Sequence, residues 1–285
     1  MYCSSLSDLR IALPLTLMHS ECVDNSLETS HSHSHLIMVA VGVIAGLTSG
    51  LFGVGGGIVI VPALVWLGMT QRRASATSLA TVVPISIVAL FSYASHGDVA
   101  IFPGILMTIG FLIGAQIGAR LLDRFSEKLL RWIFVVFIVL LIVSQLISIP
   151  ERDAQIDLNI LTALAIVACG IVVGTLAPLL GIGGGTIMVP AFISLFGASD
   201  LIARGTSLLA MFPGALSASI TNARKKLFDY KYALIMGVSA CLFSPLGNLI
   251  ATHLSPRANA ILFATYLGLI LIRSLWAALH VPREA

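Results

Sequence analysis

Ten apolar segments follow one another along this 285-residue chain, with short polar connections between them. They cover residues 36–52, 58–68, 74–95, 99–122, 129–149, 158–180, 186–197, 203–222, 231–253 and 258–280. Most approach or exceed the length of about 20 residues that a helix needs to cross a bilayer. The segments show none of the period-two alternation of barrel strands. Because lipid offers no partners to unpaired backbone groups, the sequence predicts an all-α polytopic membrane protein.

The composition excludes a soluble domain. Hydrophobic residues make up 58% of the chain and charged residues only 10%, whereas a soluble domain carries about 25% charged residues. The formal net charge is +3, and the basic residues lie in short loops rather than on one face, so we expect no nucleic acid as a partner. The expected surroundings are the lipid bilayer, with a multi-pass location in the cell membrane (plasma or inner).

A glycine cluster occurs twice in the same apolar setting. The first copy reads GLFGVGGGIVIVPAL at residues 50–64, and the second reads LLGIGGGTIMVPAF at residues 179–192. Adding 128 to the residue number takes Gly53, Gly55, Gly56 and Gly57 to Gly181, Gly183, Gly184 and Gly185. Glycines that interrupt apolar segments at matching places in two halves point to the binding site of a transporter.

The repeat continues beyond the glycines and divides the chain into two homologous halves. At an offset of 129, Thr77 and Ser78 match Thr206 and Ser207. Segments 58–68 and 186–197 directly follow the glycines and are too short to cross the bilayer, so each is a half-helix of a re-entrant or discontinuous element. The predicted organisation is a polar, histidine-containing arm at 1–35, membrane repeats at 36–149 and 158–280, a linker at 150–157 and a tail at 281–285.

The loop charges favour an inverted arrangement of the two halves. Basic residues cluster at 72–73, 120–131 and 224–231, whereas Arg152, Arg204 and Arg257 are isolated. If each glycine-broken pair of segments returns to the side from which it entered, all three clusters fall on one side, as the positive-inside rule favours. Each half then crosses an odd number of times, and the halves are inverted repeats. Segment 36–52 is long enough to cross by itself, so the alternative with full crossings stays open.

These motifs resemble those of the TauE/SafE sulfite exporter family of membrane transporters, also called TSUP or DUF81. The resemblance is carried by GVGGGIVIVP with ASATSLA in the first half and by GIGGGTIMVP with ARGTSLL in the second. It covers about residues 36–280 and leaves the arm 1–35 outside the pattern. The resemblance implies a secondary carrier for a small sulfur-containing or carboxylate anion, such as sulfite, an organosulfonate or a related organic acid.

An anion inside a membrane needs hydrogen-bond donors in place of its water shell. Backbone N–H groups at a helix N-terminus supply donors and a favourable dipole, and glycine allows close approach. The predicted substrate-binding residues are therefore Gly53, Gly55, Gly56, Gly57, Thr77, Ser78, Gly181, Gly183, Gly184, Gly185, Thr206 and Ser207. This cage requires no buried arginine. The alternative roles are helix packing for the glycines and intrahelical or interhelical hydrogen bonding for the four hydroxyl residues.

Other functional classes find little support in the sequence. The chain has no HExxH, no Walker A motif and no carboxylate in the middle of an apolar segment, so we expect no enzyme, no catalytic residue, no metal site and no cofactor. The missing intramembrane carboxylates also argue against a deep proton relay. An anion channel of the same architecture is the alternative to a carrier that works by alternating access. A homo-oligomer is compatible with all of these features.

Overall fold

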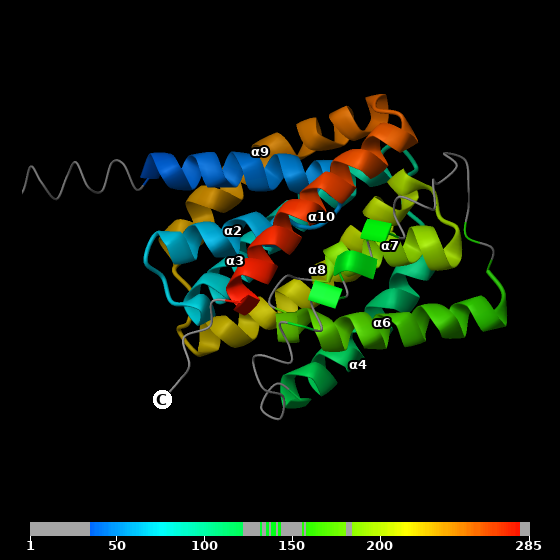
Figure 1. Ribbon diagram of the computed structural model, residues 1–285, viewed down its shortest axis with the longest axis horizontal. Helices are drawn as coiled ribbons and strands as arrows, with labels where there is room; N and C mark the ends of the chain where they lie inside the picture. Colours follow the sequence, from blue (N-terminus) through cyan, green and yellow to red (C-terminus); the bar gives the residue numbers. More distant parts are fainter. Residues whose placement is uncertain are drawn as a thin grey trace, which may run out of the picture.

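The computed structural model describes residues 35–121, 158–180 and 184–279, and a few positions between 132 and 156. Every regular element in those ranges is a helix. The helices are an N-terminal helix His35–Phe52, α2 Gly57–Trp66, α3 Gln71–Ala94, α4 Ile101–Leu121, α6 Ile160–Leu180, α7 Gly185–Phe196, α8 Asp200–Arg224, α9 Tyr230–His253 and α10 Pro256–Leu279 (Figure 1). The arm 1–34 and most of the segment predicted at 129–149 lie outside the described residues.

The predicted all-helical membrane protein is confirmed. Five of the described helices are long and apolar enough to cross a membrane. Their outer faces carry large hydrophobic side chains, of which Phe91 on α3 is 77% exposed and Leu242 on α9 is 72% exposed. Such exposure is unfavourable in water and ordinary in lipid, where the surrounding acyl chains are equally apolar.

The N-terminal helix and α2 form a helical hairpin. A Cβ atom placed on Gly56 would lie 2.8 Å from the Ala45 carbonyl oxygen, so the start of α2 touches the preceding helix. Farther along, Met38 belongs to the same buried cluster as Ile60 and Leu64. α2 therefore folds back along the N-terminal helix, and the outer ends of the two helices lie together, at the left in Figure 1.

The N-terminal helix of this first hairpin packs against α9 and runs parallel to it. A Cβ atom on Gly42 would lie 2.7 Å from the Met236 carbonyl oxygen, and Gly46 faces Ala240 in the same way. Glycine lets the two backbones approach this closely, as small residues do between membrane helices. Because both residue numbers increase together, the N-terminal helix begins at the end of the molecule where α9 begins.

The second half repeats this packing with the roles of the halves exchanged. Gly170 on α6 faces the Met107 carbonyl of α4, and Gly174 faces the Phe111 carbonyl. Gly170 and Gly174 are the repeat equivalents of Gly42 and Gly46 at an offset of 128. Met107 and Phe111 are the equivalents of Met236 and Ala240 at an offset of 129. α6 therefore begins at the end where α4 begins.

Two hydrogen bonds are exchanged between the halves in the same reciprocal way. The Ala100 N–H before α4 donates to Thr206 Oγ1 on α8 at 3.0 Å. The Asp229 N–H before α9 donates to Thr77 Oγ1 on α3 at 3.2 Å. Both pairs are related by the offset of 129. The connection before α4 thus lies at the start of α8, and the connection before α9 lies at the start of α3.

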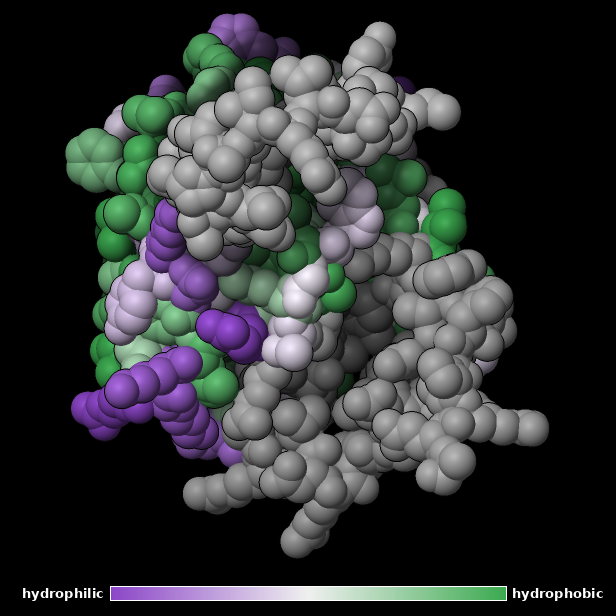
Figure 2. Space-filling view, turned by 90° about the vertical axis from the view of Figure 1, so that its left-hand side faces the viewer, coloured by the Kyte–Doolittle hydropathy of each residue, from purple (hydrophilic) through white to green (hydrophobic). Residues whose placement is uncertain are grey.

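These contacts fix which connections share an end of the molecule. Loops 67–70 and 225–229 lie at one end, which we call the basic end because the exposed residues Arg224, Lys225, Lys226 and Lys231 lie there. Figure 2 looks onto this end and shows hydrophilic residues gathered beside hydrophobic ones. Loops 95–100 and 197–199 lie at the opposite end. The first hairpin opens to the basic end and the pair α6 and α7 opens to the opposite end. This is compatible with the predicted re-entrant, inverted arrangement.

Candidate functional site

The first half-helix, α2, starts in a turn made of glycines with positive φ. Gly53, Gly55 and Gly56 have φ values of 70°, 72° and 71°. Side chains with a Cβ rarely adopt this region, so the sequence needs glycine here for the backbone alone. Gly57 then begins α2 and is buried. The chain reverses direction over these few residues inside the protein.

The second half-helix, α7, starts at Gly185 after Gly184, which has an ordinary φ of −60°. Gly181 and Gly183, also predicted as site residues, lie outside the described residues. α7 is the more deeply buried half-helix, because its first nine residues, Gly185 to Ile193, are all buried. The residues that precede the two half-helices therefore differ in backbone conformation, because φ is positive at Gly56 and negative at Gly184.

Neither half-helix has a side chain at its N-terminus that accepts a hydrogen bond from the first turn. The long helices α3, α8 and α9 do, from Thr70, Ser199 and Asp229. Asp229 Oδ1 accepts from the Lys231 N–H at 3.0 Å, as the side chain of a helix N-cap does. The first N–H groups of α2 and α7 consequently have neither a cap nor an intrahelical acceptor.

The start of α7 contacts the first glycine turn. A Cβ atom on Gly185 would lie 2.9 Å from the Val54 Cα and 3.1 Å from the Gly53 carbonyl oxygen. The same Gly53 carbonyl accepts a hydrogen bond of 2.8 Å from Ser207 Oγ on α8. The structure thus brings together Gly53, Gly185 and Ser207, which the sequence placed in one site.

A neighbouring side chain fills the side-chain position at Gly55 and at Gly184. A Cβ atom on Gly55 would collide with Met211 Cε and lie 3.1 Å from Val82 Cγ1, and one on Gly184 would lie 2.5 Å from Phe111 Cε2. Close packing, which was the alternative role for these glycines, is therefore present. It does not compete with a role of their backbone N–H groups as donors.

The four hydroxyl residues are all buried, and the described contacts of three of them join protein groups. Thr77 and Thr206 accept the reciprocal hydrogen bonds from the two loops. Ser207 Oγ also contacts the Arg204 carbonyl oxygen at 2.8 Å, one turn back on α8. Ser78 is 2% exposed. In this structure the two threonines hold the halves together, as the interhelical alternative for them expects.

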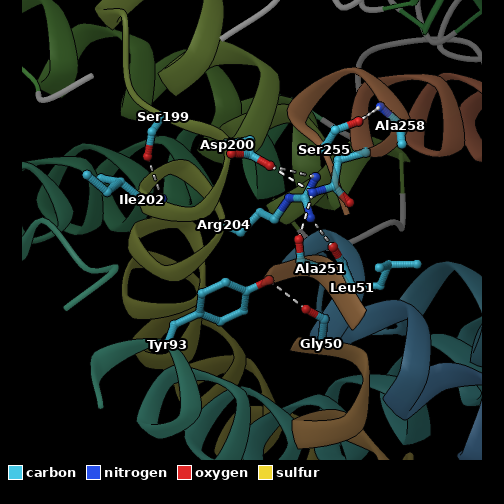
Figure 3. Close-up of polar contacts among 11 residues, drawn as sticks. Gly50, Leu51, Tyr93, Ser199, Asp200, Ile202, Arg204, Ala251, Ser255 and Ala258 are labelled. Atoms are coloured by element: carbon cyan, nitrogen blue, oxygen red, sulfur yellow. Dashed lines mark hydrogen bonds and ion pairs between the residues drawn. The ribbon is translucent and has the colours of Figure 1, made fainter. Parts of the chain in front are cut away.

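A buried charged network next to the first glycine turn was missed by the sequence reasoning (Figure 3). Arg204 and Asp200 lie one turn apart on α8, are each 1% exposed, and approach to 3.8 Å between Nη2 and Oδ2. Arg204 Nη1 donates to the Leu51 carbonyl oxygen at 2.5 Å. Asn259 Nδ2 on α10 donates to Asp200 Oδ2 at 2.9 Å.

This network holds the end of the N-terminal helix. Tyr93 Oη donates to the Gly50 carbonyl oxygen at 2.6 Å (Figure 3), beside the Arg204 contact with Leu51. The last carbonyls of a helix carry the negative end of its dipole, so a guanidinium is a favourable partner. The sequence analysis predicts an isolated basic residue at Arg204, whereas the structure places this residue inside α8. The spacing of Asp200 and Arg204 by four residues is the sequence signal for their pairing.

The predicted cage therefore has a charged neighbour. A Cβ atom on Gly53 would lie 2.7 Å from the Arg204 Cα, so the buried arginine adjoins the first glycine turn. Several buried polar atoms nearby have no hydrogen-bond partner in the structure, among them Thr186 Oγ1 in the first turn of α7 and Ser49 Oγ before the first glycine turn. Unsatisfied buried hydroxyls are uncommon and call for an explanation.

Comparison with known proteins places these features in a family. The family model described as sulfite exporter TauE/SafE matches residues 9–144 and 166–285. The match begins within the arm 1–35, so the family pattern reaches farther toward the N-terminus than the motifs indicated. The unmatched stretch 145–165 contains the predicted linker 150–157.

Curated bacterial proteins resemble the chain over most of their length. A probable membrane transporter protein of Bacillus subtilis, YunE, is 28% identical over 83% of this chain and 96% of its own length. A probable membrane transporter protein of Xylella fastidiosa is 29% identical over 84% of this chain and 92% of its own. A third, from Haemophilus influenzae, is 33% identical over 60% of this chain and 67% of its own. All three are named as transporters, in agreement with the expectation of a chain that is not an enzyme.

Proposed function

Because the chain belongs to the TauE/SafE sulfite exporter family and is a multi-pass membrane transporter, we propose that it is a secondary carrier for a small anion. The substrate class is sulfite, an organosulfonate or a related organic acid. The family description names sulfite, and the half-helix starts offer backbone donors to an anion. The carrier works by alternating access in the cytoplasmic membrane.

One observation carries this proposal: the uncapped start of half-helix α7 lies against the glycine turn from which the uncapped half-helix α2 begins. The N–H groups of Gly57 and Ile58 in α2, and those of Gly185 and Thr186 in α7, precede the first intrahelical acceptor bonds, which go to Gly56 and Gly184. Such groups form an anion site with the positive end of a helix dipole. The unpartnered Thr186 hydroxyl supplies a further donor at the same place.

Buried Arg204 adds positive charge beside the first turn, and Asp200 balances it. A permanently unbalanced cation would bind a small anion too tightly to release it, whereas a neutral pair leaves the backbone donors to provide moderate affinity. The arginine also keeps the Leu51 carbonyl oxygen, which would repel an anion, in a hydrogen bond.

Alternating access is supported by the reciprocal contacts between the halves. The hydrogen bonds of Thr77 and Thr206, and the glycine contacts of α9 with the N-terminal helix and of α4 with α6, are related by exchange of the two halves. Inverted repeats of this kind allow two conformations of similar energy that open to opposite sides. A carrier fits this arrangement better than a channel, because Met211 and Phe111 fill the space next to the glycines.

The test is a flux screen on the purified chain in proteoliposomes. Sulfite, thiosulfate, alkanesulfonates and short carboxylates are compared with and without a pH gradient. We expect saturable uptake of at least one of these anions and acceleration of labelled uptake by the same anion inside the vesicle. Uptake that neither saturates nor responds to internal anion would indicate the channel instead. Absence of flux for all four classes would contradict the proposal.

The orientation is tested separately by labelling single cysteines in a background without the native ones. Positions 72 and 225 belong to the basic clusters and 152 carries an isolated arginine, so we expect the first two to react from the cytoplasmic side and the third from outside. The reverse pattern would place the basic end outside the cell.

A further inference from the structure

Met211 on α8 lies between the starts of the two half-helices. A Cβ atom on Gly55 would collide with Met211 Cε, and a Cβ atom on Gly185 would lie 3.2 Å from Met211 Sδ. The side chain is 2% exposed. One thioether thus touches the glycine turn of each half, at the place where the proposed carrier must hold its anion.

The glycines of the site differ in what covers them. The atoms nearest to a Cβ on Gly56 and Gly185 belong to the backbone, of Ala45 and Val54. At Gly55 and Gly184 the nearest atoms are the far ends of side chains, those of Met211 and Phe111. Backbone neighbours do not move when a side chain changes its rotamer, whereas an unbranched methionine changes its rotamer at little cost. Rotation of a neighbouring side chain can therefore open space beside Gly55 and Gly184, but not beside Gly56 and Gly185.

Phe111 on α4 has the same relation to the second half-helix. Its ring lies against Gly184 before α7 and against Gly214 on α8, where any side chain would collide with it. Phe111 is 6% exposed. Each half thus contributes one apolar side chain that covers the half-helix start of the other half: Met211 from the second half covers the first, and Phe111 from the first covers the second.

We infer that Met211 and Phe111 close the anion site from its two sides and that their size sets the largest anion the protein admits. This inference rests on the proposed function. An anion can reach the N–H groups of either half-helix only after the covering side chain has moved. Because Met211 touches the starts of both half-helices, its side chain occupies the space that the apolar substituent of an organic anion needs. A larger substituent on the anion must displace more of it.

The experiment measures the size selectivity of variants in proteoliposomes. Fluxes of sulfite and of alkanesulfonates of increasing chain length are compared, with carboxylates of increasing chain length as a second series. Met211→Ala enlarges the space and Met211→Phe reduces it. Phe111→Leu shortens the other cover. The matched control is Met236→Ala, because Met236 is an equally buried methionine that packs against Gly42, between the N-terminal helix and α9.

For Met211→Ala we expect the flux ratio of propanesulfonate to sulfite, or of butyrate to acetate, to rise about tenfold, the usual effect of a methylene or more in an apolar pocket. Met211→Phe lowers the ratio and Phe111→Leu raises it less. Met236→Ala leaves it unchanged. A ratio is insensitive to the amount of folded protein, so a poorly folded variant still reports.

Two failures are distinguishable. If the unmodified chain moves anions but Met211→Ala and Met236→Ala give the same ratio as it does, the inference is wrong and the proposed function stands. If the unmodified chain moves none of these anions, the proposed function fails and the inference falls with it.

Discussion

The two glycine turns lie in equivalent parts of the repeated frame, yet their surroundings differ in charge. At the first turn, the carbonyl oxygens of Gly50, Leu51 and Gly53 accept hydrogen bonds from Tyr93, Arg204 and Ser207. Arg204 is paired in turn with Asp200 on the same helix. The end of the N-terminal helix is therefore fixed by a network that includes two buried charges.

The equivalent positions of the other half carry no charge. Subtracting 129 from Arg204 and Asp200 gives Ser75 and Gln71 on α3, and adding 129 to Tyr93 gives Asn222 on α8. Both halves have the repeated glycines, threonines and helix packing, whereas the ion pair of Arg204 and Asp200 occurs on α8 without an equivalent on α3. A rearrangement that separates the first turn from α8 must break charge-assisted hydrogen bonds in a low dielectric; the equivalent movement of the second half meets no such pair at these positions. For the proposed carrier we therefore expect the two ends to open at different cost.

The largest expected effect is that of breaking the ion pair. Arg204→Met leaves the Asp200 carboxylate buried beside Asn259 without its cation, and loss of one partner of a buried pair costs about 3–5 kcal/mol. We expect the midpoint of thermal unfolding in detergent to fall strongly. Ser75→Met at the equivalent position of α3 should have a much smaller effect.

The double variant Arg204→Met with Asp200→Asn separates charge from packing. Removing both charges should recover most of the lost stability, because a neutral pair leaves no ion uncompensated. If the double variant is no more stable than Arg204→Met, the network stabilises the first turn through shape rather than charge, and the contrast between the two ends loses its electrostatic basis.

The glycines before the two half-helices should respond unequally to alanine. Gly56 has a φ of 71° and faces the Ala45 backbone carbonyl, so Gly56→Ala combines backbone strain with a contact that cannot move. Gly184 has a φ of −60° and faces side-chain atoms of Phe111. We expect a loss of about 2–3 kcal/mol for the first and about 1 kcal/mol for the second, measured by thermal unfolding.

Transport should fall in both alanine variants, since both alter the start of a half-helix, while membrane insertion is retained. Insertion is followed by the amount of protein in washed membranes, and flux is normalised to it. Normal flux for both Gly56→Ala and Gly184→Ala would remove the glycine turns from the proposed anion site.

Much of this frame could be predicted from the sequence because it depends on local features. The predicted segments agree with the described helices within three residues at each end, since apolar length and terminal glycines or polar residues define them. The duplication predicted that Gly53 and Gly185 belong to one site, and the two residues lie next to each other in the structure. The distribution of basic residues predicted opposite directions for the two hairpins, and the described helices are compatible with that prediction.

The charged network could not be found in this way because it depends on contacts across the whole chain. Arg204 meets Leu51, 153 positions away, and Asp200 meets Asn259, 59 positions away. A pair of opposite charges at the start of a helix is more often exposed than buried, so its spacing alone predicts a surface interaction. The contacts of Met211 and Phe111 with the glycines could not be predicted either, since nothing in the sequence distinguishes one apolar residue of an apolar helix from another.

The reciprocal threonine hydrogen bonds allow a direct test of equivalence. Thr77→Val and Thr206→Val each remove the acceptor of one loop N–H and keep the side-chain shape, so each should cost about 1 kcal/mol. Because the two bonds have similar lengths, 3.2 and 3.0 Å, we expect similar shifts of the unfolding midpoint. A shift confined to one variant would show that only one of the two loops is held by its bond, and that the halves differ in their frame as well as in their charge.

The smallest effects concern the helix caps Thr70 and Ser199, which are also related by the offset of 129. Thr70 Oγ1 accepts from the backbone N–H of Arg73 at 3.4 Å, in an exposed position. Ser199 Oγ accepts from the backbone N–H of Ile202 at 3.2 Å, and Ser199 is only 2% exposed. In Thr70→Ala, water can hydrogen-bond to the Arg73 N–H that loses its cap. In Ser199→Ala, the corresponding Ile202 N–H is less accessible to water. We expect about 0.5 kcal/mol for the first and about 1 kcal/mol for the second by thermal unfolding. The opposite order would mean that the start of α8 is opened to water in solution, and with it the ion pair that sets the two ends apart.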